Sequence, residues 1–166
     1  MTDDDLISIF VAAFPRFGGD ITPQSTDPAN LAAVYSKLPA KFPPLYERLV
    51  LSHRWNEVDF RLFRLLANPR QKDLSGLTNE IFKDPGLVES LIPGGFIQFG
   101  KGPDINYDPV CFEIKSRRKD GDYRVVQIDH EGILSNYKIR IVAELAPSFR
   151  ELIQKILSMS VERVVY

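Results

Sequence analysis

The sequence predicts an α+β fold in which a mainly antiparallel sheet is flanked by N-terminal helices and a C-terminal helix. Helical patterns occupy both ends of the chain, and between them short strand-like segments follow one another through turn signals. Strands joined by short turns pair in the antiparallel sense. The chain has 166 residues, of which 44% are hydrophobic, and it contains no low-complexity linker or repeat. We therefore expect one domain over residues 1–166.

The first half of the chain is predicted to be largely helical. Residues 3–14 place hydrophobic side chains at helical spacing behind three aspartates, whose negative charge suits a helix N-terminus. An aspartate followed by proline, a typical helix beginning, occurs at Asp27-Pro28 and at Asp84-Pro85. The predicted helices of this half are residues 3–14, a helix after Asp27-Pro28, a helix from near Pro43-Pro44, residues 75–82 and residues 85–91.

Strands are predicted from residue 58 onward. Val58, Phe60 and Leu62 recur with a period of two, which is typical of a strand with one wetter face. Beyond a turn at residues 93–95, apolar runs alternate with polar connections, and Asp120-Gly121 is a hairpin-type turn. The predicted strands are residues 58–63, 96–99, 110–114 and 123–128, with a short extended segment at residues 137–143.

The C-terminal part contains the clearest helical pattern of the chain. Ser148 and Glu151 have capping-box spacing, and hydrophobic residues from Phe149 to Leu157 form one stripe. Residues 161–166 alternate between apolar and polar positions. They suit an edge strand, either within the fold or against a neighbouring copy, so the sequence leaves the oligomeric state open.

Charge and composition exclude several classes of protein. The net charge of −1 argues against a strongly basic nucleic-acid-binding protein, and the single cysteine excludes a disulfide framework. No run of residues is long and apolar enough to span a membrane, and the acidic beginning is not a secretory signal. We expect a cytoplasmic protein without a membrane partner. The small net charge conceals acidic and basic blocks, because residues 73–113 alone hold seven acidic and two basic residues.

The sequence contains partial matches to catalytic and metal-binding motifs, but none has all the required residues at the required spacing. His130-Glu131 begins like a zinc-protease helix, but Leu134 stands where the second histidine is needed. Residues 104–108 begin like a calcium loop, but Pro109 and Lys115 occupy the positions of the required glycine and glutamate. Cys111 lies within an apolar strand, where cysteine is usually buried and inert. We therefore expect no metal site, no cofactor and no catalytic residue.

Three weaker patterns have structural explanations. Asp129, His130 and Glu131 form the best acid–base candidate, but consecutive side chains of an extended segment point to opposite faces, which favours a turn-stabilising role. His53 suits the C-terminal end of the third helix. Aromatic residues near residues 96–112 and the basic run at residues 115–119 resemble a nucleic-acid platform. The basic run has no interleaved aromatic residue, so we do not expect a nucleic-acid partner.

Several motifs in the same order resemble the SUKH superfamily. They cover about residues 38–157 and comprise Leu38-Pro39 with residues 44–49, residues 97–100 followed by residues 107–113, residues 125–131, and residues 146–153. The segment between Trp55 and Pro93 is longer and more helical than the family core, and its role is left open. The resemblance implies an α+β domain without enzymatic activity. Bacterial members are typically immunity proteins that neutralise a toxin, often a nuclease or a deaminase, and a fungal branch regulates cell-wall assembly through protein contacts.

The leading hypothesis is therefore a protein-binding domain of the immunity type. The alternatives are a regulatory or scaffold module that binds a cellular protein, and a hydrolase that uses Asp129, His130 and Glu131. We expect acidic and aromatic residues of the loop 101–108 and of the neighbouring strand end to contact a basic partner. The predicted partner-binding residues are Asp104, Asn106, Tyr107, Asp108, Asp129 and Glu131.

Overall fold

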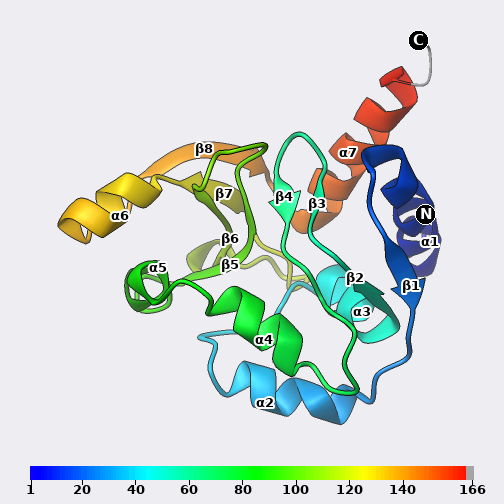
Figure 1. Ribbon diagram of the computed structural model, residues 1–166, viewed down its shortest axis with the longest axis horizontal. Coiled ribbons are helices and arrows are strands. Elements are labelled where there is room, and N and C mark those ends of the chain that lie inside the picture. Colours follow the sequence, from blue (N-terminus) through cyan, green and yellow to red (C-terminus); the bar gives the residue numbers. More distant parts are fainter. Residues whose placement is uncertain (164–166) are drawn as a thin grey trace.

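The computed structural model describes the backbone of residues 1–163 and the side chains of residues 1–159. It confirms the predicted α+β class, because helices from both ends of the chain flank a six-stranded antiparallel sheet with the order β3-β4-β5-β6-β7-β8 (Figure 1). A separate antiparallel pair joins β1 to β2. The strands are β1 (Ile21–Pro23), β2 (His53–Trp55), β3 (Val58–Asp59), β4 (Arg64–Leu65), β5 (Phe96–Lys101), β6 (Pro109–Glu113), β7 (Val125–Ile128) and β8 (Ile141–Ala146).

The helices predicted from sequence are present, and their caps are the expected ones. Asp27 and Asp84 each accept a hydrogen bond from a backbone N–H two residues on. Of the predicted capping box, the Ser148 hydroxyl accepts the Glu151 N–H, while the Glu151 carboxylate accepts from the Ser148 hydroxyl. The described helices are α1 (Asp3–Ala13), α2 (Leu31–Tyr35), α3 (Pro44–Ser52), α4 (Ser75–Ile81), α5 (Pro85–Leu91), α6 (His130–Asn136) and α7 (Phe149–Arg163).

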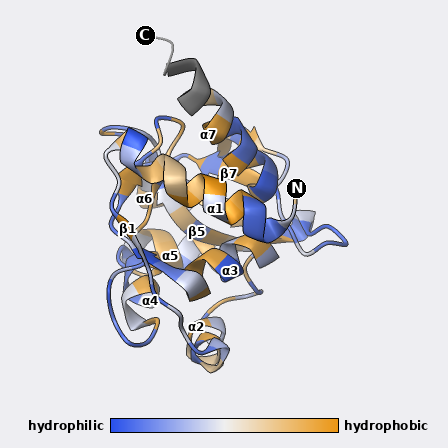
Figure 2. Cartoon of the chain, turned by 90° about the vertical axis from the view of Figure 1, so that its right-hand side faces the viewer, coloured by the Kyte–Doolittle hydropathy of each residue, from blue (hydrophilic) through white to orange (hydrophobic). Residues whose placement is uncertain are grey.

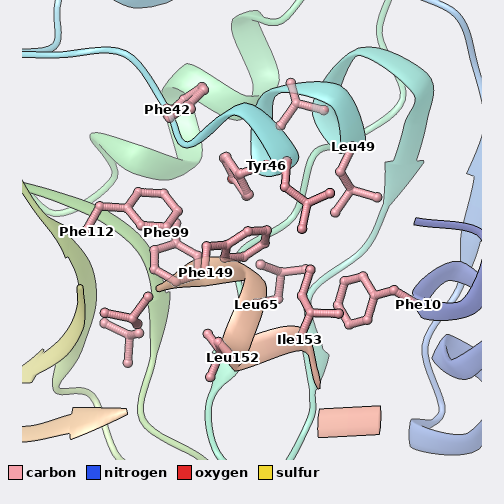
Figure 3. Close-up of a cluster of buried hydrophobic side chains, with 14 of the residues drawn as sticks. Phe10, Phe42, Tyr46, Leu49, Leu65, Phe99, Phe112, Phe149, Leu152 and Ile153 are labelled. Carbon is pink, nitrogen blue, oxygen red and sulfur yellow. The ribbon is translucent and has the colours of Figure 1, made fainter. Parts of the chain in front are cut away.

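The main hydrophobic core lies on one face of the sheet, beneath α1, α3 and α7. Phe99 and Phe112 stack with their ring centroids 4.0 Å apart, and Tyr46 and Phe149 contact both rings edge-on (Figure 3). In Figure 2, α1 is hydrophilic at its N-terminal end, where three aspartates occupy the first turn, and hydrophobic further along. This layer buries most of the large apolar side chains and fixes the curvature of the sheet.

The opposite face of the sheet carries a second, smaller core. Because side chains alternate along β5, Ile97 and Phe99 enter the main core while Phe96 points to the other face. There, Phe96 packs with Cys111, Val126 and Ile128 beneath α5 and α6, which lie side by side against the sheet (Figure 1). These two short helices position the candidate site described below.

The single strand predicted over residues 58–63 is wrong. The chain reverses within this segment to form a small hairpin, in which the Phe60 N–H donates to the Phe63 carbonyl and Arg61 adopts a positive φ of 74°. A continuous strand would point Phe60 and Phe63 to opposite faces. In the hairpin, both side chains enter the main core. The hairpin strands β3 and β4 extend the sheet, which answers part of the question about the segment between Trp55 and Pro93.

The extended tip predicted after residue 128 is also wrong, because residues 130–136 form α6. The Asp129 carboxylate caps this helix by accepting a hydrogen bond from the Glu131 N–H, and Tyr137 ends it with a φ of 55°. The extended segment predicted at residues 137–143 begins later and forms β8. A seven-residue helix is too short for hydrophobic periodicity to distinguish it from a loop.

The structure also bears on three predictions about single residues and the C-terminal segment. Cys111 is buried as expected, and burial raises the pKa of its thiol. His53 is the C-cap residue of α3, at the predicted helix end, and it also begins β2; burial lowers the pKa of its imidazole. Residues 161–163 belong to α7 instead of an edge strand, and residues 164–166 lie outside the described residues. Among the helices of residues 1–163, none has the length and apolarity needed to cross a membrane.

Candidate functional site

The loop between β5 and β6, residues 102–108, is held by side chains of the β3–β4 hairpin, Arg64 and Asp59. Arg64 of β4 donates from Nε to the Gly102 carbonyl at 2.8 Å and from its terminal nitrogen to the Asn106 carbonyl at 2.5 Å. Its guanidinium lies 5.5 Å from the centre of the Tyr107 ring. A side chain at Gly102 would collide with Asn106, so this close turn requires glycine. Arg64 thus fixes the loop that the sequence predicts as a binding loop.

Asp108, at the end of this loop, is joined to His130 at the beginning of α6. One carboxylate oxygen of Asp108 lies 2.6 Å from His130 Nδ1 and accepts a hydrogen bond from the His130 backbone N–H at 3.1 Å. The other oxygen accepts from Gln127 Nε2 at 3.2 Å. The antiparallel register of β6 and β7, with Val110 opposite Gln127, brings the beginning of one strand beside the end of the other.

These contacts change the protonation of the Asp108 carboxyl. Partial burial by itself would raise its pKa, but the hydrogen bonds from His130 and Gln127 outweigh burial and lower the pKa below its ordinary value. Asp108 is therefore a carboxylate at neutral pH. It orients the imidazole with Nδ1 inward, and His130 Nε2 has no hydrogen-bond partner within the described part of the chain.

Asp129 stands beside this pair but is occupied by other contacts. Possible ligand atoms of Asp108, Asp129 and His130 all lie within 4.8 Å of one another, which is the spacing of a metal site. However, Asp129 caps α6 with one oxygen and contacts Arg140 with the other at 3.0 Å, and both Asp108 oxygens accept hydrogen bonds. A cation would have to displace these contacts and would face the Arg140 charge, so the donor set does not fit a metal ion well.

A pocket of about 510 Å³ opens beside His130, between the sheet and helices α5 and α6. Its walls combine apolar side chains from the two helices with polar side chains from β5 and the loop. This volume lies within the range of small-ligand sites. The side chains that line the pocket are Lys83, Asp84, Pro85, Leu87, Gln98, Lys101, Tyr107, His130 and Leu134.

Most of the exposed large hydrophobic side chains belong to the loop 102–108, to α6 with its C-cap, and to the beginning of β8, and we call this set the apolar surface. Two of its members, Tyr107 and Leu134, line the pocket. Of the eight large hydrophobic side chains exposed in the described part of the chain, six belong to it. They are Ile105, Tyr107, Leu134, Tyr137, Ile141 and Val142.

The six residues predicted to bind a partner fall into two groups. Asp104, Tyr107 and Glu131 are exposed, and the two acidic side chains make no ion pair with any other described residue. Asn106 is exposed but uses its side-chain oxygen to accept the Asp108 N–H at 2.7 Å. Asp108 and Asp129 are turned inward to organise His130 and α6. The structure therefore brings together the loop and the strand end, as predicted, with His130 between them.

The sequence did not predict that Arg64 holds the loop 102–108 or that α5 forms one wall of the pocket. Arg64 precedes the loop it holds by about 40 residues, and no local pattern distinguishes it from the other arginines. The Asp84-Pro85 cap does predict α5, but not its place across the pocket from α6. In comparisons with known proteins, no family model and no curated protein matches this chain.

Proposed function

We propose that this chain is a non-enzymatic protein-binding domain, and most concretely an immunity-type protein that binds and neutralises a toxin in the cytoplasm. The observation that carries the binding role is the pocket with exposed Tyr107 and Leu134 of the apolar surface in its lining, because exposed apolar side chains at a pocket are typical of interaction sites. The toxin-neutralising role is supported by the resemblance of residues 38–157 to the SUKH superfamily and by the α+β fold.

The charge of the apolar surface indicates the kind of partner. Asp104 precedes Tyr107 by three residues in the same loop, and Glu131 lies in the first turn of α6 beside the pocket-lining His130. Exposed carboxylates around apolar anchors suit a partner with basic residues at its rim, as a nuclease or a nucleic-acid deaminase would present. Arg64 and Asp108 keep the loop and α6 in place, so little ordering is required when the partner binds.

Binding of the purified chain to the toxin domain encoded beside its gene tests this proposal. We expect a stable complex and loss of the toxin's enzymatic activity. The double variant Ile105→Ala with Tyr137→Ala should weaken the complex by about 30-fold or more, because apolar anchors at an interface each contribute about 1–2 kcal/mol. The charge-reversal variant Asp104→Lys with Glu131→Lys should also weaken it, most strongly at low salt.

The matched control is Ile9→Ala, which removes an exposed hydrophobic side chain from α1 on the far side of the sheet (Figure 1). It should bind like the unmodified chain. Equal affinity of all four proteins would contradict the assignment of the surface. Failure to bind or inhibit the toxin would contradict the toxin-neutralising function, and it would leave the regulatory or scaffold alternative as the better hypothesis.

A hydrolase is the second candidate, and the Asp108–His130 contact favours it. A carboxylate on Nδ1 with a free Nε2 at a pocket is the arrangement of a general base. Among the pocket-lining residues there is no serine, threonine or cysteine that could act as a nucleophile, so His130 would have to activate water. Toxin-independent turnover of ester or phosphoester substrates that is abolished by His130→Ala would support this candidate. Equal turnover rates of the unmodified chain and the His130→Ala variant would contradict the hydrolase hypothesis.

A further inference from the structure

The floor of the pocket beside His130 carries a hydrogen-bond acceptor. Gln98 lies on β5 on the same face as Phe96 and is only 8% exposed. Its Nε2 donates to the Gly100 carbonyl at 3.0 Å, which assigns the amide orientation. Its Oε1 accepts no hydrogen bond from any described residue, and Gln98 lines the pocket. An acceptor on a pocket wall that no protein donor occupies favours a ligand that donates a hydrogen bond.

The imidazole of His130 supplies a second acceptor to the same pocket. Because the Asp108 carboxylate holds Nδ1, the proton of the neutral ring stays on Nδ1, and Nε2 carries a lone pair. The remaining walls are apolar and come from Pro85 and Leu87 of α5 and Leu134 of α6. The pocket thus combines a polar end with two acceptors and an apolar remainder.

The charges at the rim disfavour an ionic ligand. A cation such as a guanidinium or an ammonium group would find one carboxylate in the pocket lining, that of Asp84, which already accepts a backbone N–H in the cap of α5. Lys101 lies 3.2 Å from Glu57 and Lys83 lies 3.8 Å from Glu80, so their charges are already balanced against an anion. Asp84 adds a carboxylate to the same rim. A neutral ligand is therefore the best match.

We propose that this pocket binds a neutral aromatic group carrying one hydrogen-bond donor, a phenol or an indole, and that it receives a tyrosine or tryptophan side chain of the protein partner. The assignment to a partner rests on the proposed function, because two members of the apolar surface line the pocket. Tyrosine and tryptophan are the side chains that most often anchor interfaces in pockets, since they bury a large apolar area and keep one polar atom to be satisfied.

The chemistry of the pocket can be tested without the partner. Titration of the isotopically labelled full chain with 4-methylphenol, followed by two-dimensional NMR, should shift the signals of Gln98, Tyr107 and His130. Toluene, which has the same ring but no donor, should bind about fivefold more weakly, the value of one neutral hydrogen bond. Equal affinity for the two compounds, or shifts located elsewhere, would overturn the proposal.

Two variants locate the acceptors. Gln98→Met and His130→Phe each remove one acceptor while keeping a side chain of similar size, and each should reduce the preference for 4-methylphenol over toluene. Gln154→Met is the matched control, since it makes the same replacement at an exposed position of α7 that does not line the pocket. Its preference should equal that of the unmodified chain, and a uniform effect of all three changes would contradict the assignment.

The same variants distinguish the source of the aromatic group. If the aromatic group belongs to the toxin, Gln98→Met should weaken the complex by about fivefold or more, while Gln154→Met should not. Normal toxin affinity of Gln98→Met would overturn the assignment to the partner. Binding of 4-methylphenol without toxin binding would contradict the proposed function alone, and toxin binding without preference for 4-methylphenol would contradict this inference alone.

Discussion

Replacement of Phe112 by alanine is expected to lower the free energy of unfolding by about 3–5 kcal/mol. The Phe112 ring is fully buried, stacks on Phe99 at 4.0 Å and is contacted edge-on by Tyr46 and Phe149 (Figure 3). These rings come from two strands and two helices, so the cavity left by alanine cannot be closed by the movement of one element. Urea denaturation followed by circular dichroism measures the loss.

Two further variants control for this experiment. Phe112→Leu keeps most of the apolar volume and should lose clearly less stability than Phe112→Ala. Phe17→Ala removes a partly buried phenylalanine from the margin of the same core and should also lose less. A loss for Phe112→Ala no greater than that for Phe17→Ala would contradict the central position of the Phe99–Phe112 stack.

The second large effect is expected at Asp122, a buried carboxylate in the connection between β6 and β7. One of its oxygens accepts from the Tyr123 N–H at 2.7 Å and the Phe149 N–H at 2.9 Å, and the other accepts from the Arg150 N–H at 3.2 Å. Asp122 therefore joins the β6–β7 connection to the beginning of α7, 27 residues away in sequence. The carboxylate also lies at the positive end of the helix dipole.

Asp122→Ala should lower the free energy of unfolding by about 2–4 kcal/mol, because buried backbone N–H groups lose a charged acceptor. Hydrogen exchange at the Phe149 and Arg150 amides should accelerate more than at the middle of α7. Asp120→Ala is the control, since Asp120 is exposed and its carboxylate accepts only the Asp122 N–H among the hydrogen bonds of the described chain. Equal losses for the two variants would show that the link to α7 contributes little.

Local patterns were sufficient for most of the secondary structure. Caps at Asp27, Asp84 and Ser148 define helix beginnings through contacts within a few residues, so they can be recognised in a sequence. Two of the errors, at residues 58–63 and 130–136, concern segments of six and seven residues, too short for periodicity alone to distinguish helix, strand and turn. There, burial of Phe60 and Phe63 and the contact of His130 with Asp108 decide the conformation.

The candidate site could be predicted only in part. The loop and the strand end were correctly expected to be neighbours, because antiparallel pairing of β6 and β7 follows from their order. Their register was not predictable, since a 3₁₀ turn at Ile114–Ser116 lengthens the connection beyond the tight hairpin that Asp120-Gly121 suggests. That register places Asp108 against His130 and turns two of the predicted binding acids inward.

The sequence by itself determined the α+β class, the helix caps, the buried cysteine and the acidic loop, because each depends on composition or on contacts between near neighbours. Only the tertiary structure decided that Arg64 holds this loop, that α5 and α6 cover one end of the second sheet face, and that Gln98 and His130 share a pocket there. These features join residues that are distant in sequence. They form only when the sheet register and the packing of both faces are fixed together, and local patterns carry no signal for that.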